Sequence, residues 1–302
     1  MLKERLIPIS WNPTADCASQ HFGLWCIEPR WISDAVAALR AGMCVVFPAK
    51  AESSNDAFYS TTPDGIALVR ISGQIMKGFS KFGGTNSIMV RRALTLAAND
   101  PAVNGMMMVI DSPGGTVAGT DDAAKTVRMF AQRKPLYVQA EDLMASAAYW
   151  IGSQADYVAA TQTTEVGSIG VMAVVYDTSG MYAKEGIKVH VMATGEQKGA
   201  GVDGTEVLPK HLEAMQQRVD DVDRFFKGAV MAGMGLSQEQ MAAASSGDVW
   251  IAERAKSMGL IDAVQDFGAT YHALVDEVNR RKDADANATQ RRLRLAVAKN
   301  TA

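Results

Sequence analysis

The clearest pattern in the chain is an alternation of short apolar runs with longer amphipathic stretches, which begins near residue 66. The apolar runs have the length and the flanking turn residues of buried strands. We expect strands at IALVRISG, VNGMMMVID, PLYVQAE, YVAAT, IGVMAVVYD and KVHVMAT. Helices are expected between them, at 87–100, 117–132, 144–155 and near 179–186. A strand and a helix roughly every 30 residues is typical of βαβ units, so the sequence predicts an α/β fold around a largely parallel sheet.

The ends of the chain lack this alternation, which divides the sequence into three parts. Residues 1–65 are an expected N-terminal segment, with a helix at Trp31–Ala41 and then a linker rich in Ser, Asn, Pro and Gly. The core at 66–265 includes a long amphipathic helix at Pro209–Met234. Residues 266–302 are expected to form a helix followed by a mobile basic tail.

Composition places the chain among ordinary globular proteins. Of its 302 residues, 48% are apolar and 21% are charged, and the net charge is −3. That balance gives no general attraction to nucleic acid or acidic lipid, so nucleic-acid binding is not expected. The cysteines Cys17, Cys26 and Cys44 fit no metal-binding spacing, and the sequence has no paired-histidine metal motif. We therefore expect neither a metal nor another cofactor.

Hydropathy and cysteine usage bear on the compartment. No run of about 18 apolar residues is present, and the first residues, MLKERLIPISWNP, lack the apolar centre of a secretory signal. The odd number of cysteines favours a reducing environment. These features predict a cytoplasmic protein without a membrane anchor.

Chemistry is expected where short polar or glycine-rich pieces follow predicted strands, because open α/β sheets bind ligands at the carboxyl ends of their strands. The first such piece is DSPGGTVAG, residues 111–119. Pro113 cannot continue a central strand, and Gly114 and Gly115 permit unusual backbone angles. The turn either directs backbone N–H groups at an anion, as half of an oxyanion hole, or simply connects strand and helix.

The second piece is MASAAYW, residues 144–150, in which Ser146 is surrounded by alanines. Small neighbours suit a sharp strand-to-helix turn that presents a nucleophile, and the start of the following helix favours negative charge. The N–H of Ala147 is suitably placed to complete an oxyanion hole. The piece lacks the G-x-S-x-G pattern, however, and a serine at a helix start is often only a cap.

The third piece is TGEQKGAG, residues 194–201, where Lys198 is followed by glycine. Such a lysine is either an exposed loop residue or, if burial and hydroxyl donors keep it neutral, a general base. Ser168, in VGSIGV, is the candidate for holding the lysine amine. Ser146 and Lys198 together would form a Ser/Lys pair for acyl transfer.

A Ser-His-Asp triad is the competing arrangement. His190 lies within a predicted strand, and His211 and His272 lie on predicted helices. We expect structural roles for these histidines.

Taken in order, DSPGG, MASAAYW, TEVGSIGV and TGEQK resemble the signal peptide peptidase A family of serine peptidases, peptidase family S49. The likeness covers residues 66–265 and includes the late segment GDVWIAERAKSMGLID. Each motif alone is weak, but four in this order are specific. The resemblance implies a crotonase-like (ClpP/crotonase) α/β fold of repeated ββα and βα units, with additional C-terminal helices.

The same resemblance assigns roles to individual residues. It implies Ser146 as the nucleophile, Lys198 as the general base and Ser168 as the residue that positions the lysine. The backbone of the oxyanion hole would come from Gly114 or Gly115 together with Ala147. The chain has Ala147–Ala148 where the family has Gly-Gly, and Asp111 where Asn is common, and neither change removes a catalytic group.

The membrane anchor of the cellular enzymes is not seen in the sequence, which favours the phage head-maturation and capsid assembly branch of the family. By resemblance, the protein is then a serine endopeptidase (EC 3.4.21) that acts on capsid, scaffold or portal proteins in the host cytoplasm or within the procapsid. A homo-oligomeric ring is also implied, in which serine and lysine can come from neighbouring subunits.

Three other functions remain open from the sequence. One is a cellular peptidase for signal-peptide remnants. Another is a crotonase-type enzyme acting on acyl-CoA, for which Glu165 is the nearby acid or base. The third is a non-catalytic capsid assembly scaffold that has kept the fold.

Overall fold

The computed structural model describes residues 24–29, 58–78 and 84–300. The expected helix at Trp31–Ala41 and most of the predicted linker lie outside these residues. In the described part, eight strands form the main sheet. They are β2 (Ser60–Thr61), β3 (Ile66–Ser72), β6 (Gly105–Ser112), β8 (Leu136–Ala145), β9 (Tyr157–Ala160), β10 (Glu165–Gly167), β11 (Val249–Ile251) and β12 (Ala263–Val264).

The centre of the main sheet is parallel, as the alternation of strands and helices predicts. The strand order is β11-β10-β8-β6-β3-β2, with β9 paired to β8 and β12 paired to β9. Strands β3, β6, β8, β9 and β10 run parallel, and antiparallel pairs occur at the β2 and β11 edges. The α/β class is therefore confirmed.

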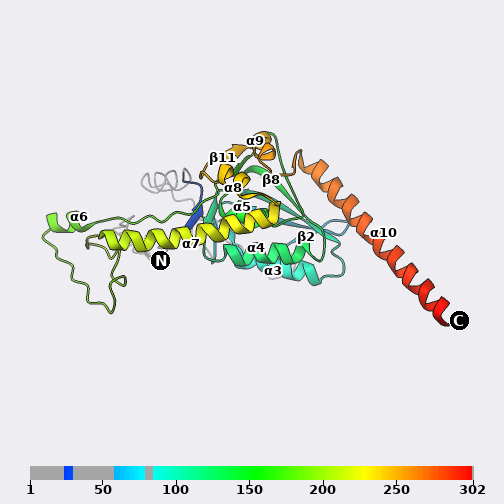
Figure 1. Ribbon diagram of the computed structural model, residues 1–302, viewed down its shortest axis with the longest axis horizontal. Coiled ribbons are helices and arrows are strands. Elements are labelled where there is room, and N and C mark those ends of the chain that lie inside the picture. Colours follow the sequence, from blue (N-terminus) through cyan, green and yellow to red (C-terminus); the bar gives the residue numbers. More distant parts are fainter. Residues whose placement is uncertain (1–23, 30–57, 79–83, 301–302) are drawn as a thin grey trace, which may run out of the picture.

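Eight helices are described besides the strands (Figure 1). They are α3 (Ser87–Asn99), α4 (Thr120–Ala131), α5 (Ala147–Gly152), α6 (Ser179–Lys184), α7 (Pro209–Met234), α8 (Gln238–Ala244), α9 (Ala252–Ser257) and α10 (Phe267–Asn300). Helix α3 begins after Asn86, whose side chain accepts a hydrogen bond from the backbone N–H of Ile88. Helix α7 has the bounds expected from its amphipathic pattern.

The continuous apolar run of β6 is explained by burial on both faces of the sheet. Its alternate residues Met106, Met108 and Ile110 belong to the core that includes α3, α4 and α5. Met107 and Val109 pack on the other face in a smaller cluster that includes two residues of α10. Helices therefore cover both faces, and few polar side chains fit on this strand.

A second, smaller sheet lies at the carboxyl ends of the main strands. Its order is β1 (Trp25–Ile27), β7 (Gly114–Thr116), β4 (Ile75–Met76) and β5 (Thr85–Asn86). Strand β7 follows directly after β6, so the glycine turn that the sequence singles out is the junction between the two sheets.

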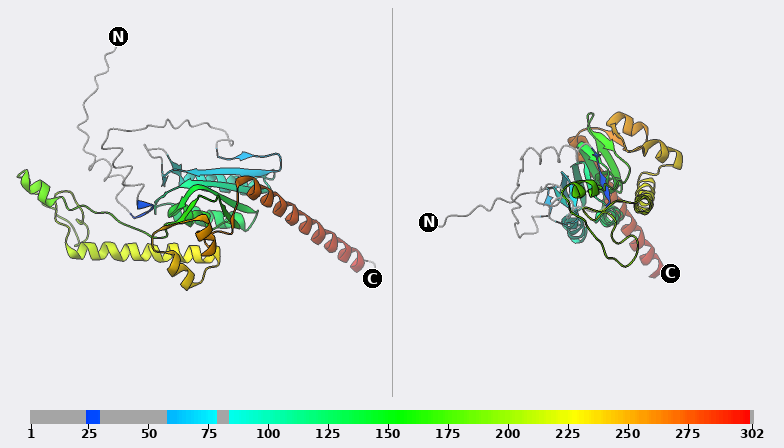
Figure 2. Two further views of the ribbon diagram at one scale, coloured as in Figure 1. Left: turned by 90° about the horizontal axis from the view of Figure 1, so that it is seen from above. Right: turned by 90° about the vertical axis from the view of Figure 1, so that its left-hand side faces the viewer.

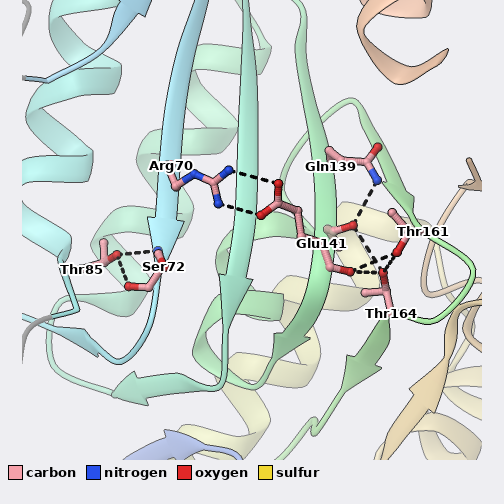
Figure 3. A network of polar contacts seen from close by, with 8 residues as sticks. Arg70, Ser72, Thr85, Gln139, Glu141, Thr161 and Thr164 are labelled. Atoms are coloured by element: carbon pink, nitrogen blue, oxygen red, sulfur yellow. Dashed lines mark hydrogen bonds and ion pairs between the residues drawn. The ribbon is translucent and has the colours of Figure 1, made fainter. Parts of the chain in front are cut away.

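Polar contacts link strands of the main sheet close to this junction (Figure 3). Arg70 of β3 reaches across β6 and donates two hydrogen bonds to Glu141 of β8, at 2.6 and 3.1 Å. Strand β8 carries a bulge here, because Ile110 pairs with Ala140 whereas Ser112 pairs with Met144. Bulges bend a strand and redirect the residues that follow, and the residue after β8 is Ser146.

Part of the chain projects away from this body (Figure 1). We call residues 173–221, which include α6 and the first half of α7, the arm. The second half of α7 packs on the core, where Phe226 stacks on Trp150 with ring centroids 4.7 Å apart. Helix α10 extends on the opposite side of the body from the arm (Figure 2).

Three expectations differ from the structure. The segment KVHVMAT, 188–194, is not a strand but lies on the arm without regular structure, and 169–177 forms only an isolated bridge at Met172. The alternation in 188–194 is real, but a strand needs a neighbour for its backbone, and the described part of the chain offers none there. The predicted tail is also different, since α10 continues as one helix to Asn300.

Candidate active site

Ser146 is the connection between β8 and α5, and its backbone is strained. Its φ of 54° and ψ of −117° lie in a region that residues with a side chain rarely adopt. The backbone N–H donates to Gly167 O at 2.7 Å, which fixes the turn against β10. Among the described non-glycine residues, positive φ angles occur at Ser146 and Ser168, the two serines that the sequence singles out.

The side chain of Ser146 does not act as a helix cap. It makes no capping hydrogen bond to α5, and its Oγ is buried without a hydrogen-bond partner in the described structure. The flanking Ala145, Ala147 and Ala148 are fully buried, so larger side chains would not fit around the turn. A buried hydroxyl without a partner costs stability and is rare in folded proteins, so its presence calls for an explanation. A nucleophile provides one and a helix cap does not, so the observations favour the nucleophile interpretation.

The glycine turn lies directly beside Ser146. Gly114 has φ of 96°, and a Cβ there would meet Ala145 O and Ala147 N at 2.9 Å each. At Gly115 the constraint is space, because a Cβ would lie 1.8 Å from Ile75 O. Both glycines are thus required, one mainly by its backbone angle and the other by close approach.

The two candidate N–H donors of the turn differ in their partners. The N–H of Gly114 donates to Ser112 Oγ at 3.2 Å, and Ser112 in turn donates to Gly73 O at 2.6 Å. The N–H of Gly114 is thus already used inside the turn. Gly115 is the better candidate for an oxyanion donor, together with the first N–H groups of α5, which have no partner within the helix.

Ser168 is brought to the same place by sheet pairing. Gly167 pairs with Ala145 in the parallel register of β10 and β8, so Ser168 follows β10 where Ser146 follows β8. Ser168 is 4% exposed, has φ of 50°, and donates its backbone N–H to Asp248 O at 2.7 Å. Two strained serines therefore occupy adjacent strand ends.

Lys198 is not brought to Ser146 within the chain. It is exposed, and it lies on the arm rather than at the end of a strand. The loop around it is held locally, because Gln197 donates to Lys210 O at 3.3 Å and Glu196 forms an ion pair with Lys210 at 3.4 Å. The expectation that all three pieces follow strands is wrong for this one.

The histidines in the described part of the chain lie away from Ser146. His211 is buried at the start of α7, where its Nδ1 accepts a hydrogen bond from the N–H of Leu208 at 3.3 Å. His190 is exposed on the arm rather than in a strand, and His272 is exposed on α10. None of these three is arranged as the base of a triad.

A residue that the sequence did not single out, Cys26, is a neighbour of Ser146. Burial raises the pKa of the Cys26 thiol far above its ordinary value, the negative charge of Asp223 raises it further, and interaction with the Ser146 hydroxyl lowers it. The two side chains are close, but no hydrogen bond joins them, since Ser146 Oγ has no hydrogen-bond partner in the described structure. No local sequence signal connects Cys26 with Ser146, since β1 reaches the site only through strand pairing.

The fold and the site together define an α/β protein with a strained serine at a strand-to-helix turn beside a glycine turn. Its sequence identifies it more closely: the profile of peptidase family S49 matches residues 128–281, slightly more than half of the chain, and the chain belongs to this family.

Named relatives include phage and cellular proteins. Capsid assembly protease C of Escherichia phage lambda is 30% identical over 72% of this chain and 51% of its own length. Head-tail preconnector protein GP5 of Enterobacteria phage P21 is 34% identical over 58% of this chain and 36% of its own. Protease 4 of Haemophilus influenzae is 29% identical over 73% and 36%. The chain thus spans about half or less of the length of these relatives.

Solved structures that align with the chain have low similarity. ClpP1 of Listeria monocytogenes aligns at 15% identity with a TM-score of 0.44, over 66% of this chain and 91% of that one. An enoyl-CoA hydratase/isomerase family member aligns at 12% identity with a TM-score of 0.43, over 76% and 75%. The description of the fold therefore rests on its own sheet topology. No helix in the described ranges is both long and apolar enough to span a bilayer.

Proposed function

We propose that this protein is a serine endopeptidase in which Ser146 is the nucleophile and Lys198 of a second copy is the base. The observation that carries the proposal is the combination of a strained, partnerless Ser146 in the core with an exposed Lys198 on a projecting arm. A base supplied by a neighbouring arm would complete the site.

The surface of the arm supports an assembly of this kind. Of residues 173–221, only His211 is buried, and several large apolar side chains are exposed. They include Val174, Tyr176, Met181, Ile187, Val191 and Met192. A concentration of exposed apolar groups on one segment is typical of a protein interface. A second copy of this chain is the partner that fits, because its Ser146 also has no base beside it and would receive one from this arm.

The proposed reaction uses only groups of the protein and water. Neutral Lys198 Nζ takes the proton of Ser146 as Oγ attacks the peptide carbonyl, and Ser168 Oγ orients the amine. The N–H groups of Gly115 and Ala147 stabilise the oxyanion, by about 3–4 kcal/mol for one donor. Collapse breaks the C–N bond, and Lys198 returns the proton to the leaving amine. Water, deprotonated by Lys198, then hydrolyses the acyl ester and restores Ser146.

Polypeptides of a phage head are the substrates we propose, because relatives are named as a capsid assembly protease and a head-tail preconnector protein. Capsid, scaffold and portal proteins fit this class, and they would be met in the host cytoplasm or inside a procapsid. A relative from Enterococcus faecium is named as a putative signal peptide peptidase, so signal-peptide remnants are the second substrate class that we propose.

The test is co-expression with candidate capsid, scaffold and portal proteins, with cleavage products read by mass spectrometry. Ser146→Ala and Lys198→Ala should each lower cleavage by at least about 10³-fold. Lys188→Ala, an exposed lysine on the same arm, is the matched control and should retain activity.

Co-expression of the two inactive variants tests whether the dyad is shared. Random mixing pairs an intact serine with an intact lysine from another copy in about one quarter of the sites, so roughly that share of activity should return. Cleavage by Ser146→Ala alone would refute the nucleophile. Two inactive variants that do not complement each other would show that serine and lysine act within one subunit.

A further inference from the structure

Strand β1 crosses the candidate active site between two elements on either side of Ser146. On one side it pairs antiparallel with β7, with Trp25 opposite Thr116, Cys26 opposite Gly115 and Ile27 opposite Gly114. On the other side Trp25 and Met172 exchange two backbone hydrogen bonds of 2.9 Å. Met172 follows shortly after Ser168, so β1 fills the space between the glycine turn and the segment after β10.

The hydrogen-bond pattern of β1 places one carbonyl at the proposed oxyanion donor. Val117 N donates to Leu24 O at 3.0 Å, and Glu28 N donates to Pro113 O at 2.7 Å. Hydrogen-bonded pairs alternate along an antiparallel ladder, so the pair midway between these two, Cys26 and Gly115, is also hydrogen-bonded. The N–H of Gly115 therefore binds the carbonyl of Cys26.

The surroundings of Gly114 place the same carbonyl near the second proposed donor. A Cβ on Gly114 would lie 2.3 Å from Cys26 O and 2.9 Å from Ala147 N. The carbonyl of Cys26 thus lies between the glycine turn and the start of α5. A peptide carbonyl undergoing attack by Ser146 would occupy this position.

Strand β1 also closes the site. Ser146 is 1% exposed, and Cys26 and Ile27 of β1 are 0% and 3% exposed. Ser146 Oγ is fully buried, and Cys26 of β1 is one of its neighbours, so a second polypeptide cannot occupy the same place with β1 present.

We propose that residues 24–28 are a built-in substrate mimic, which binds as an extended strand in the peptide groove and keeps the enzyme inactive until it leaves. This inference rests on the proposed function and adds its regulation. The Cys26–Ile27 peptide takes the place of the scissile bond. A true substrate binds in the same way, as a strand between β7 and the segment around Met172, and must displace β1. As part of the same chain, β1 competes at high effective concentration.

The test compares two substitutions at one position of the full chain. Trp25→Pro removes the N–H that binds Met172 O and disfavours the strand, whereas Trp25→Phe keeps the backbone donor and an aromatic ring. The probe is a fluorophosphonate, and its rate of attachment to Ser146 is followed by mass spectrometry. Trp25→Pro should react about tenfold faster than the wild type, and Trp25→Phe at nearly the wild-type rate.

A second readout follows the strand itself. In a Cys17→Ser, Cys44→Ser background, Cys26 is the remaining thiol, and its alkylation should be slow in the wild-type strand and fast in Trp25→Pro. If Trp25→Pro exposes the thiol while Ser146 labelling stays unchanged, β1 is not the cover and the inference is overturned. Cleavage of the wild-type chain between Cys26 and Ile27 would support it.

A third measurement uses the protein with wild-type Trp25, so it tests the inference even if Trp25→Pro fails to fold. A phosphonate group on Ser146 requires the space that β1 occupies, so labelled protein should show faster alkylation of Cys26 than unlabelled protein. Equal rates would refute the inference. Failure of the proposed function looks different, because Ser146→Ala would then leave substrate cleavage intact whatever β1 does.

Discussion

The body of the molecule and its arm differ in how far their side chains are buried. In the body, parallel strands are buried on both faces, and the turns that carry Ser146 and Gly114 are fixed by backbone contacts on several sides. In the arm, residues 173–221 are almost entirely solvent-accessible, and apolar side chains such as Met192 are 94% exposed. The apolar side chains of the body are therefore covered by its own packing, whereas those of the arm are left exposed in the single chain.

This contrast bears on the division of a reaction between the two regions. A nucleophile must be held rigidly, and strain at Ser146 persists because the surrounding sheet over-determines it. A base that arrives on a separate segment can be withheld until assembly. In the proposed mechanism, the body positions the nucleophile, whereas the arm and β1 control when the base and the substrate reach it.

The largest effect on stability is expected where the arm joins the body. Phe226 is fully buried and stacks on Trp150, while its neighbour Phe225 is 66% exposed. Phe226→Ala should lower the free energy of unfolding by about 3–5 kcal/mol, because it leaves a cavity between α7 and α5. Phe225→Ala should change it by less than roughly 0.5 kcal/mol. Urea denaturation of both variants measures this, and equal losses would show that α7 does not dock as described.

A medium effect is expected from glycines of the two regions. Gly114→Ala should cost about 1–3 kcal/mol and reduce cleavage, because φ of 96° and three nearby backbone atoms leave no room for a methyl group. Gly180→Ala on α6 is the matched change in the arm, where a Cβ would have nothing within 4 Å. It should be neutral or stabilising by up to about 1 kcal/mol, since alanine favours helix. Thermal unfolding measures the stability of both variants, and a peptide cleavage assay measures their activity. Equal effects of Gly114→Ala and Gly180→Ala would contradict the contrast between the body and the arm.

The smallest effect is expected on the stability of the arm at low pH. Hydrogen bonds from Ser179, and then from the N–H of Val207, lower the pKa of Asp177 below its ordinary value of 3.8. A lowered folded pKa means that this support is present above pH 3.8 and is lost as pH falls through the folded value. The rate at which pepsin cuts the wild-type arm should then rise as the pH falls below 3.8. The rate is measured relative to that for an unstructured peptide in the same reaction, which corrects for the pH dependence of pepsin.

Two substitutions separate this effect from general acid sensitivity. Asp177→Ala should be cut readily without that pH step, because the hydrogen bonds are already lost. Asp203→Ala, on the exposed surface of the arm, should keep the wild-type profile. A wild-type profile without the step would show that Asp177 does not stabilise the arm.

The sequence predicted most of the body because its local signals agree with its packing. The apolar run around Met107 and the helix that begins at Ser87 both have the structures expected of them. The prediction failed at 188–194, where alternating residues indicate a strand but no neighbouring strand is present in the described structure to complete it. The closeness of Ser146 and Gly114 followed from their positions after predicted parallel strands. That of Ser168 did not, because the sequence predicted a strand after it, at 169–177, whereas β10 precedes it. The position of Lys198 did not, because its segment belongs to the arm.

By itself the sequence singled out candidate residues for chemistry and the central strands of the parallel sheet, since both are marked by short runs of neighbouring residues. Only the tertiary structure decided that Lys198 lies apart from Ser146 and that Cys26 lies against it. Those relations depend on pairing between segments that are distant in the chain, and register between distant strands is set by the packing of the whole molecule rather than by any local pattern.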